Sequence, residues 1–239
     1  MYSPLEQFKV IPNIRLFNLN YDLTISNHTI FNIISILISI YIIYNTPGIL
    51  SNKREIISKL LYIRIENIIR EMLGKTKYIP LIYSIFIMIL INNIIGLIPY
   101  SYTITSHIIY TIYISSIIII GTTYIGIVKH KLNFYKLFIP SGLTGGTIYI
   151  IPLIFIIEII SYISRIISLS VRLTANMISG HLLLHIITNF GIHLSIYLLV
   201  IPILLLLPIY ILEFAVCIIQ SYVFTILIIS YIKDVEYLH

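Results

Sequence analysis

Two long apolar runs near the C-terminus constrain this chain more than any other feature of its sequence. The first extends from Thr147 to Asn189, and the second, which contains Pro202 and Pro208, extends from Leu194 to Ile232. As one helix, the first run of roughly 43 residues would be about 65 Å long, whereas a bilayer core is only about 30 Å thick. The first run must therefore form either two spans in a hairpin or one strongly tilted helix.

The composition excludes a soluble globular domain. Of the 239 residues, 59% are hydrophobic and 10% are charged, and the mean hydropathy is +1.02. A soluble domain carries about 25% charged residues, so this chain lacks the charges to solvate its surface. The single Cys217 can form neither an internal disulfide nor a thiolate metal cluster. The chain is therefore predicted to be a membrane protein.

The remaining segments complete an all-α membrane fold, in which the whole chain, 1–239, forms a single domain. Its parts are an N-terminal segment (1–27), a first transmembrane helix (28–46), an interfacial amphipathic helix (50–78), a transmembrane helical hairpin (79–128) and two long, strongly tilted membrane helices (140–239). The helix at 50–78 is predicted because its apolar residues recur at three- and four-residue steps between basic ones. A solvated basic linker is the alternative for this segment.

The distribution of basic residues predicts the orientation of the chain. The net charge of +6 could indicate a nucleic-acid partner, but the basic residues gather between apolar spans. The two basic stretches lie one hairpin apart, at 50–78 and 129–136, and so fall on the same side of the membrane. Basic residues are enriched in the loops on the cytoplasmic or matrix side of a membrane, so these two stretches are expected on that side. The N-terminus is then expected on the opposite side, and no nucleic-acid partner is expected.

Six ionisable side chains lie inside the two long runs, where lipid is expected. They are those of Glu158, Arg165, Arg172, His181, His185 and Glu213. Each charge at bilayer depth costs several kcal/mol, about 3 kcal/mol by the smaller estimates. A purely structural anchor would not retain six such groups, so they are candidate functional residues.

Helical geometry sorts these groups into faces. Glu158, Arg165 and Arg172 are spaced by sevens and lie on one stripe, with about 20° of drift per step. His181 lies nearly opposite this stripe, and His185 lies beside His181. The first long helix therefore has a guanidinium face and an imidazole face.

The last run carries a polar face of its own. Glu213, Cys217 and Gln220 share one side of a helix. If the two long helices pack antiparallel, the Glu213 face could meet the histidine face.

This arrangement favours proton movement. Carboxylate and imidazole groups can load and release protons near neutral pH. Arginine stays charged, so a buried Arg172 acts as a fixed cation between two water-accessible paths. The sequence has no phosphate-binding glycine loop, His-Glu-x-x-His zinc motif or nucleophile elbow, so it predicts no catalytic site and no cofactor. His181 and His185 could chelate a metal, but no third ligand is near them in the sequence.

Several residues keep a structural alternative. Arg172 could be an ion-pair partner of Glu158, and Arg165 could serve helix packing instead of a proton path. His185 could be a core histidine. Asp234, beside Lys233, is by default a solvated surface charge.

Three sequence blocks carry a resemblance to a known family. They read IEIISYISR at 157–165, SLSVRLTANM at 168–177 and GHLL at 180–183, and Glu213 to Phe224 adds a fourth match. The chain closely resembles subunit a of F-type ATP synthases, the mitochondrial form in particular. The segment from Ser3 to Phe8 also looks like the mature N-terminus of fungal versions.

The resemblance implies a proton-conducting stator subunit. Arg172 would face the carboxylates of the rotating c-ring and prevent a proton short circuit between two offset half-channels. The half-channel on the intermembrane-space side would contain His181 and Glu213, with His185 beside His181. The half-channel on the matrix side would contain Glu158 and Asp234. Asn176 and Gln220 would lie beside the arginine. The overlong helices would lie almost in the membrane plane.

The resemblance also implies partners and a location. The partners would be the c-ring, the peripheral stalk and other membrane-sector subunits, with protons and lipid but no nucleotide. The location would be the mitochondrial inner membrane, as a multi-pass protein with its N-terminus facing the intermembrane space.

Two other function classes remain open from the residues alone. An ion-coupled transporter or a respiratory proton-pump subunit could use the same charges, but transporters commonly show inverted repeats, and none is evident here. A non-conducting anchor would not need the buried ionisable set.

Overall fold

A computed structural model describes residues 8–17, 23–44, 53–98, 101–131, 151–192 and 200–236. These residues are predominantly helical. Their α-helices are α1 (Asn27–Tyr44), α2 (Lys53–Leu73), α3 (Ile79–Leu97), α4 (Ile108–His130), α5 (Ile151–Ile192) and α6 (Val200–Glu236). The predicted N-terminal match at residues 3–7 and the stretch 132–150, which includes the start of the predicted 140–239 unit, lie outside the described residues.

The helices have the lengths and composition of a membrane protein. Helices α3 and α4, together with Pro152–Gly191 of α5 and Pro202–Glu236 of α6, are long and apolar enough to cross a membrane. The apolar part of α1, Asn27–Ile43, is shorter, at about 26 Å. The all-α membrane class predicted from the sequence is confirmed.

A short β-ribbon precedes α1 and was not anticipated. Strands β1 (Pro12–Phe17) and β2 (Leu23–Ser26) pair antiparallel, with Pro12 opposite Ser26. A lone two-stranded ribbon is marginal in stability. Here β2 leads directly into α1, and the amide of Asn27 donates to the carbonyl of Ile11 at 3.2 Å. The ribbon is thus attached to the start of the first apolar helix.

Helix α2 is amphipathic, as its spacing predicts. Ile65, Ile69 and Leu73 recur every four residues and are buried in the shared core. The hydroxyl of Tyr83 on α3 donates to the carbonyl of Ser58 at 3.3 Å, which fixes α2 against α3. The exposed basic side chains of α2 include those of Lys59, Arg64 and Arg70. The interfacial location of this helix remains a prediction.

Helices α3 and α4 form the predicted hairpin. The 3-10 turn η2 (Ile104–Ser106) lies between them, and α4 begins at Ile108. Thr111 on α4 and Thr174 on α5 share a buried hydroxyl hydrogen bond of 2.7 Å. The hairpin is thereby fixed to the first of the two long helices.

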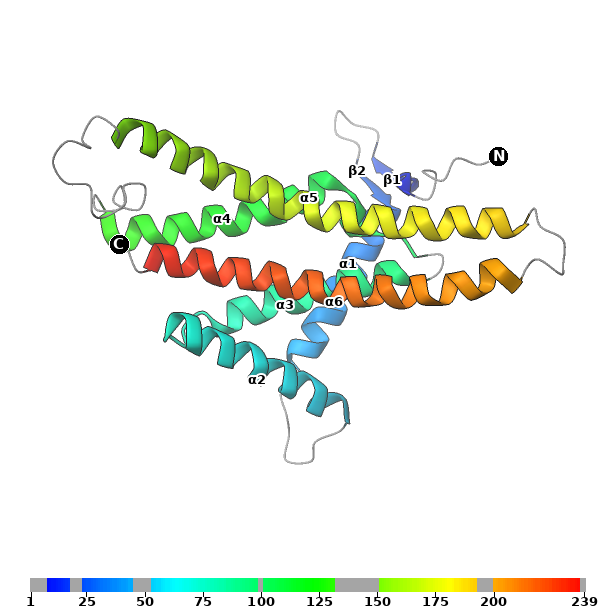
Figure 1. Ribbon diagram of the computed structural model, residues 1–239, viewed down its shortest axis with the longest axis horizontal. Helices are drawn as coiled ribbons and strands as arrows, with labels where there is room; N and C mark the ends of the chain where they lie inside the picture. The colour runs from blue at the N-terminus through cyan, green and yellow to red at the C-terminus, as the bar shows by residue number, and fades with distance from the viewer. Residues whose placement is uncertain are drawn as a thin grey trace.

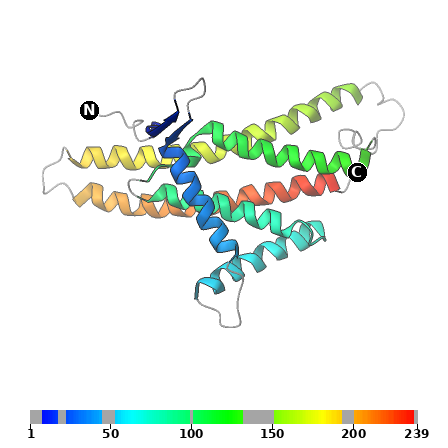
Figure 2. The same ribbon diagram turned by 180° about the vertical axis from the view of Figure 1, so that it is seen from behind.

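Helices α5 and α6 are each continuous, so the first apolar run is one long helix and not a hairpin of two spans. With 42 residues, α5 is about 63 Å long. The two helices run antiparallel along the longest axis of the molecule, and α1 crosses that axis steeply (Figures 1 and 2). Pro208 lies inside α6 without ending it. This crossing is the geometry expected if α1 spans the bilayer and the long pair is strongly tilted.

The buried core joins four of these helices. Ile69 of α2, Ile82 of α3, Leu173 of α5 and Phe224 of α6 belong to one cluster of buried apolar side chains. Many apolar side chains on the other faces of α5 and α6 are exposed, such as Leu204 at 71%. These faces are suited to lipid or to another membrane subunit.

Candidate functional site

The packing of α5 against α6 brings the candidate residues together. Leu169, Leu173 and Met177 on α5 are buried at four-residue steps, and Cys217 and Phe224 are buried on α6. Residues at this spacing share one helix face, so the two faces form a continuous seam. Polar side chains lie along this seam and at both of its ends.

At one end of the seam, the Glu213 face meets the histidine face, as helical geometry predicted. His181 Nε2 lies 3.6 Å from Glu213 Oε1, and the two side chains are 15% and 4% exposed. Gly180 makes this approach possible, because a Cβ at that position would lie 2.7 Å from Glu213 Oε1. Sequence reasoning missed Gly180, although its place directly before His181 could have indicated a close helix contact.

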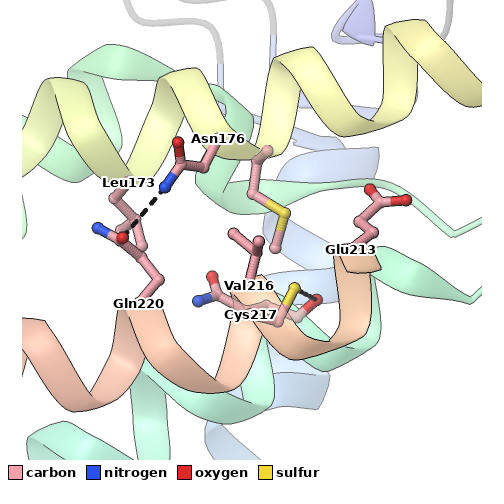
Figure 3. Close-up of a pocket in the computed structure, with 8 residues that line it drawn as sticks. Leu173, Asn176, Glu213, Val216, Cys217 and Gln220 are labelled. Carbon is pink, nitrogen blue, oxygen red and sulfur yellow. Dashed lines mark hydrogen bonds between the residues drawn. The ribbon is translucent and has the colours of Figure 1, made fainter. Parts of the chain in front are cut away.

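A second polar contact lies further along the seam. Asn176 Nδ2 of α5 donates to Gln220 Oε1 of α6 at 3.1 Å, and Figure 3 shows these two side chains pointing toward each other. Between this contact and Glu213 lies a cavity of about 10 Å³, whose walls include Asn93 and Cys217. A cavity needs roughly 10–15 Å³ to hold one water molecule. The seam thus carries a polar line from Glu213 to Asn176 and Gln220.

The other end of the seam carries an ion cluster. Arg165 lies 3.7 Å from a carboxylate oxygen of Glu158 and 3.5 Å from one of Asp234, so it bridges α5 and α6. The three side chains are between 32% and 49% exposed. Arg165 also lies over the ring of Tyr231, 5.5 Å from its centroid. The arginine that sequence reasoning left undecided is therefore a partner of both acidic candidates.

Arg172 lies between the two ends and is exposed. Within the described residues it makes no ion pair, and Glu158 is paired with Arg165 instead. The alternative that Arg172 is a structural partner of Glu158 is therefore wrong in this structure. Within two turns of Arg172, the exposed neighbours on its face include three small residues, Ser168, Ala175 and Ser179. The guanidinium thus lies on an exposed part of α5 beside small side chains.

His185 lies on the wall of a larger pocket. The pocket has a volume of about 540 Å³ and is lined in part by His181, His185, Tyr102 and Tyr210. His185 Nδ1 is 2.9 Å from Asn189 Nδ2, one turn further along α5. No group of three potential metal-ligating side chains occurs among the residues that the structure describes. Within the described residues, His181 and His185 therefore have no third side chain beside them that could complete a metal site.

A half-buried histidine, His107, lies directly before α4 and beside Tyr102 of the pocket wall. His107 Nε2 is hydrogen bonded to the hydroxyl of Tyr102. Burial lowers the pKa of His107 and raises the pKa of Tyr102, so both groups favour their neutral forms. The ring nitrogen of a neutral imidazole can accept a hydrogen bond from the tyrosine hydroxyl, which stabilises this turn.

A further cluster was missed because it lies beyond the apolar run. Glu236, at the end of α6 and 5% exposed, is paired with Lys75 and lies 2.5 Å from Lys129 Nζ. The hydroxyl of Tyr78 donates to its other oxygen at 3.0 Å. These contacts fix the end of α6 to the start of α3 and the end of α4. Asp234, two residues earlier, is held in place by the same attachment.

Comparisons with known proteins agree over nearly the whole chain. A sequence model of the family described as ATP synthase A chain matches residues 26–233. A Zancudomyces culisetae protein named ATP synthase subunit a is 39% identical over 250 residues, an alignment that covers 100% of both chains. An Emericella nidulans protein of the same name is 38% identical over 254 residues, covering 99% of this chain and 97% of the relative. The chain therefore belongs to the ATP synthase subunit a family.

Proposed function

We propose that this chain carries protons to and from a rotating c-ring along two offset half-channels that Arg172 keeps apart. Membership of the subunit a family makes the chain a proton-translocating membrane component of the ATP synthase. The single observation that carries the finer proposal is an exposed arginine between two separate polar clusters of one helix pair.

The spacing of the clusters along α5 supports two paths and not one. Glu158 and His181 are 23 residues apart, which corresponds to about 35 Å of helix. Arg172 lies between them. A proton that reaches one cluster cannot pass directly to the other over this distance, so it needs an intermediate carrier. The carboxylates of a rotating ring would be that carrier.

The outer surface around Arg172 suits a closely packed partner. Ser168, Ala175 and Ser179 have small side chains, and small residues allow another helix to approach the backbone. A partner carboxylate could then reach the guanidinium. Arginine cannot release its proton, so a permanently positive Arg172 would repel protons and block leakage between the paths.

We assign the inflow path to the buried end of the seam. The pocket of about 540 Å³ reaches His181, and His181 is in contact with Glu213. From Glu213 the polar line continues through the small cavity to Asn176 and Gln220. His185, on the pocket wall, would lie at the outer part of this path.

We assign the outflow path to the exposed cluster of Glu158 and Asp234. Their carboxylates are partly exposed, so water can reach them from the adjacent side of the membrane. Arg165 holds the two carboxylates near each other. The basic residues at the ends of α2 and α4 would make this side the matrix.

The assembly and location follow as parts of the same proposal. The chain would be a single multi-pass domain of the mitochondrial inner membrane, with its N-terminus toward the intermembrane space and α5 and α6 strongly tilted around the ring. The peripheral stalk and other membrane-sector subunits would hold it against rotation. It would have no catalytic site of its own and would bind no nucleotide.

Replacing the arginine tests the proposal directly. In purified ATP synthase reconstituted into vesicles, Arg172→Ala should lower ATP-driven proton pumping by at least about 100-fold, because proton leakage would uncouple the ring. The assembled complex should still be recovered, since Arg172 is exposed. Arg70→Ala is the matched control, because Arg70 is exposed on α2 and pairs only with Glu66 in the described residues. Normal pumping by Arg172→Ala would refute the proposed role.

A further inference from the structure

A second pocket shares no lining residue with the two pockets of the proton-path candidates. It has a volume of about 540 Å³ and is lined mainly by α1, α3 and α4, with Ile232 of α6 at one end. Its walls are almost entirely apolar and include Ile85, Met88, Ile114, Ile118 and Ile125. Neither the proposed half-channels nor the c-ring surface uses this pocket.

The volume of the pocket shows whether a transmembrane helix or a lipid acyl chain can fill it. A membrane-spanning helix about 10 Å across and 30 Å long fills roughly 2,400 Å³, about four times the volume available. An acyl chain of one leaflet reaches about 15 Å, half the thickness of the bilayer core. Along α4 the pocket extends from Tyr110 to Ile125, about 22 Å. The pocket therefore fits an acyl chain and is too small for a helix.

One end of the pocket is strongly basic. Tyr78 lines the pocket and follows Lys77, and Ile125 lies one helical turn before Lys129. The exposed lysines at this end are Lys75, Lys77, Lys129 and Lys131. Among the described residues here, the carboxylate of Glu236 pairs with Lys75 and Lys129, and Lys77 and Lys131 make no ion pair. Positive charge therefore exceeds negative charge at the mouth.

We propose that this pocket binds an anionic phospholipid, with one acyl chain between α1, α3 and α4 and the phosphate at the lysine-rich end. An acyl chain that enters the pocket leaves an equally apolar bilayer, so the chain alone gives little selectivity. The headgroup must supply the preference. A phosphate beside several lysines is recognised by charge, as in other basic pockets between membrane helices.

Photolabelling of the intact complex tests this site. ATP synthase is reconstituted into vesicles that contain phosphatidylglycerol or phosphatidylcholine with a diazirine on one acyl chain. Phosphatidylglycerol should label the α4 residues Ile114 and Ile118 at least about fivefold more than phosphatidylcholine does. In the double variant Lys77→Ala and Lys131→Ala, labelling by phosphatidylglycerol should fall toward the phosphatidylcholine level.

A second variant tests occupancy of the pocket itself. Gly121 lines the pocket and has no atom within 4 Å of an added Cβ, so Gly121→Phe should fill the space without a backbone clash. Labelling by both lipids should then fall at least about fivefold, as expected when the chain is displaced. The matched control is Ile120→Phe, at a position that is 63% exposed and outside the pocket wall.

Three results would overturn the proposal. Equal labelling by the two lipids would show that the lysines confer no selectivity. Unchanged labelling in Gly121→Phe would show that the lipid lies elsewhere. Absence of label from both lipids would show that a protein segment occupies the pocket. The readout does not depend on proton conduction, so it is independent of the role proposed for Arg172.

Discussion

The two ends of the α5–α6 seam hold their charges in opposite ways. At the His181 end, Glu213 is 4% exposed and its nearest ionisable partner is a histidine at 3.6 Å. At the other end, Glu158 and Asp234 are 41% and 49% exposed and share one permanently charged arginine. Both ends carry carboxylates on the same helix pair, yet only Glu213 is buried.

The difference in burial indicates that the two ends handle protons differently. A buried carboxyl without a permanent cation can change protonation state as its surroundings change, which suits the loading of a proton. Water can reach the partly exposed carboxylates of Glu158 and Asp234, so water can take the place of either one. The buried end should therefore depend on the chemistry of single residues, whereas the exposed end should tolerate their replacement.

The largest difference is expected from removing the buried carboxyl. Glu213→Gln keeps the size of the side chain but cannot carry a proton, so proton uptake by reconstituted ATP synthase should fall roughly tenfold or more. The barrier at Arg172 should persist, so passive leakage should stay unchanged. The corresponding change at the exposed end, Glu158→Gln, is the control and should have a much smaller effect. Equal losses in both variants would remove the distinction between the two ends.

A smaller loss is expected from crowding the buried end. In Gly180→Ala the new Cβ would lie 2.7 Å from Glu213 Oε1, so the carboxyl must move within a buried seam. Overpacking typically destabilises a fold by about 1–3 kcal/mol, and the displaced carboxyl should lower proton uptake by roughly threefold to fivefold. Gly121→Ala provides the control, because a Cβ there meets no atom within 4 Å. If both alanine variants pump normally, the fit of Gly180 against Glu213 is unimportant.

Sequence reasoning located the buried end better than the exposed one. Helical geometry gave His181 and Glu213 a polar face each and predicted that these faces could meet if the long helices pack antiparallel; the contact is confirmed. The bridge by Arg165 was left open because Asp234 lies beyond the apolar run, and only the helix register brings it to α5. Gly180 was missed because the need for a small residue depends on the distance between two helices, which periodicity does not give.

The sequence pattern also predicts some parts of the fold and not others, because it does not show how the elements pack. Continuous apolar runs, and the periodicity of 50–78, located all six α-helices of the described residues but not the 3-10 turn η2. They did not predict the ribbon of β1 and β2, whose strands of six and four residues are too short for a clear alternation. They also left open whether the first long run was one helix or two, since that choice depends on how the helices cross.

The exposed end should respond weakly when its bridge is removed. In Arg165→Gln the amide can still donate hydrogen bonds to Glu158 or Asp234, but the permanent charge is lost. Partly exposed ion pairs contribute at most about 1 kcal/mol, so proton release should change by no more than about fivefold. The rate of ATP synthesis at several matrix-side pH values measures this step. A loss as large as that of Glu213→Gln would mean that the exposed cluster is as constrained as the buried one.

The smallest effect concerns the turn between α3 and α4, outside the buried end, where His107 is hydrogen bonded to Tyr102. Burial lowers the pKa of His107 in the folded chain below its ordinary value of 6.5, so the unfolded segment binds the proton more readily. The local fold around residues 101–107 is then most stable above pH 6.5 and loses stability as the pH falls below that value. Amide hydrogen exchange in this segment of the purified complex should accelerate by a few-fold between pH 7.5 and roughly 5.5 after correction for intrinsic rates. His107→Gln keeps an acceptor for Tyr102 but cannot titrate, so it should reduce this dependence; the imidazole of His28, whose ring lies 5.7 Å from that of His107, remains in place. If the variant kept the full dependence, a group other than His107 would control the stability of this segment.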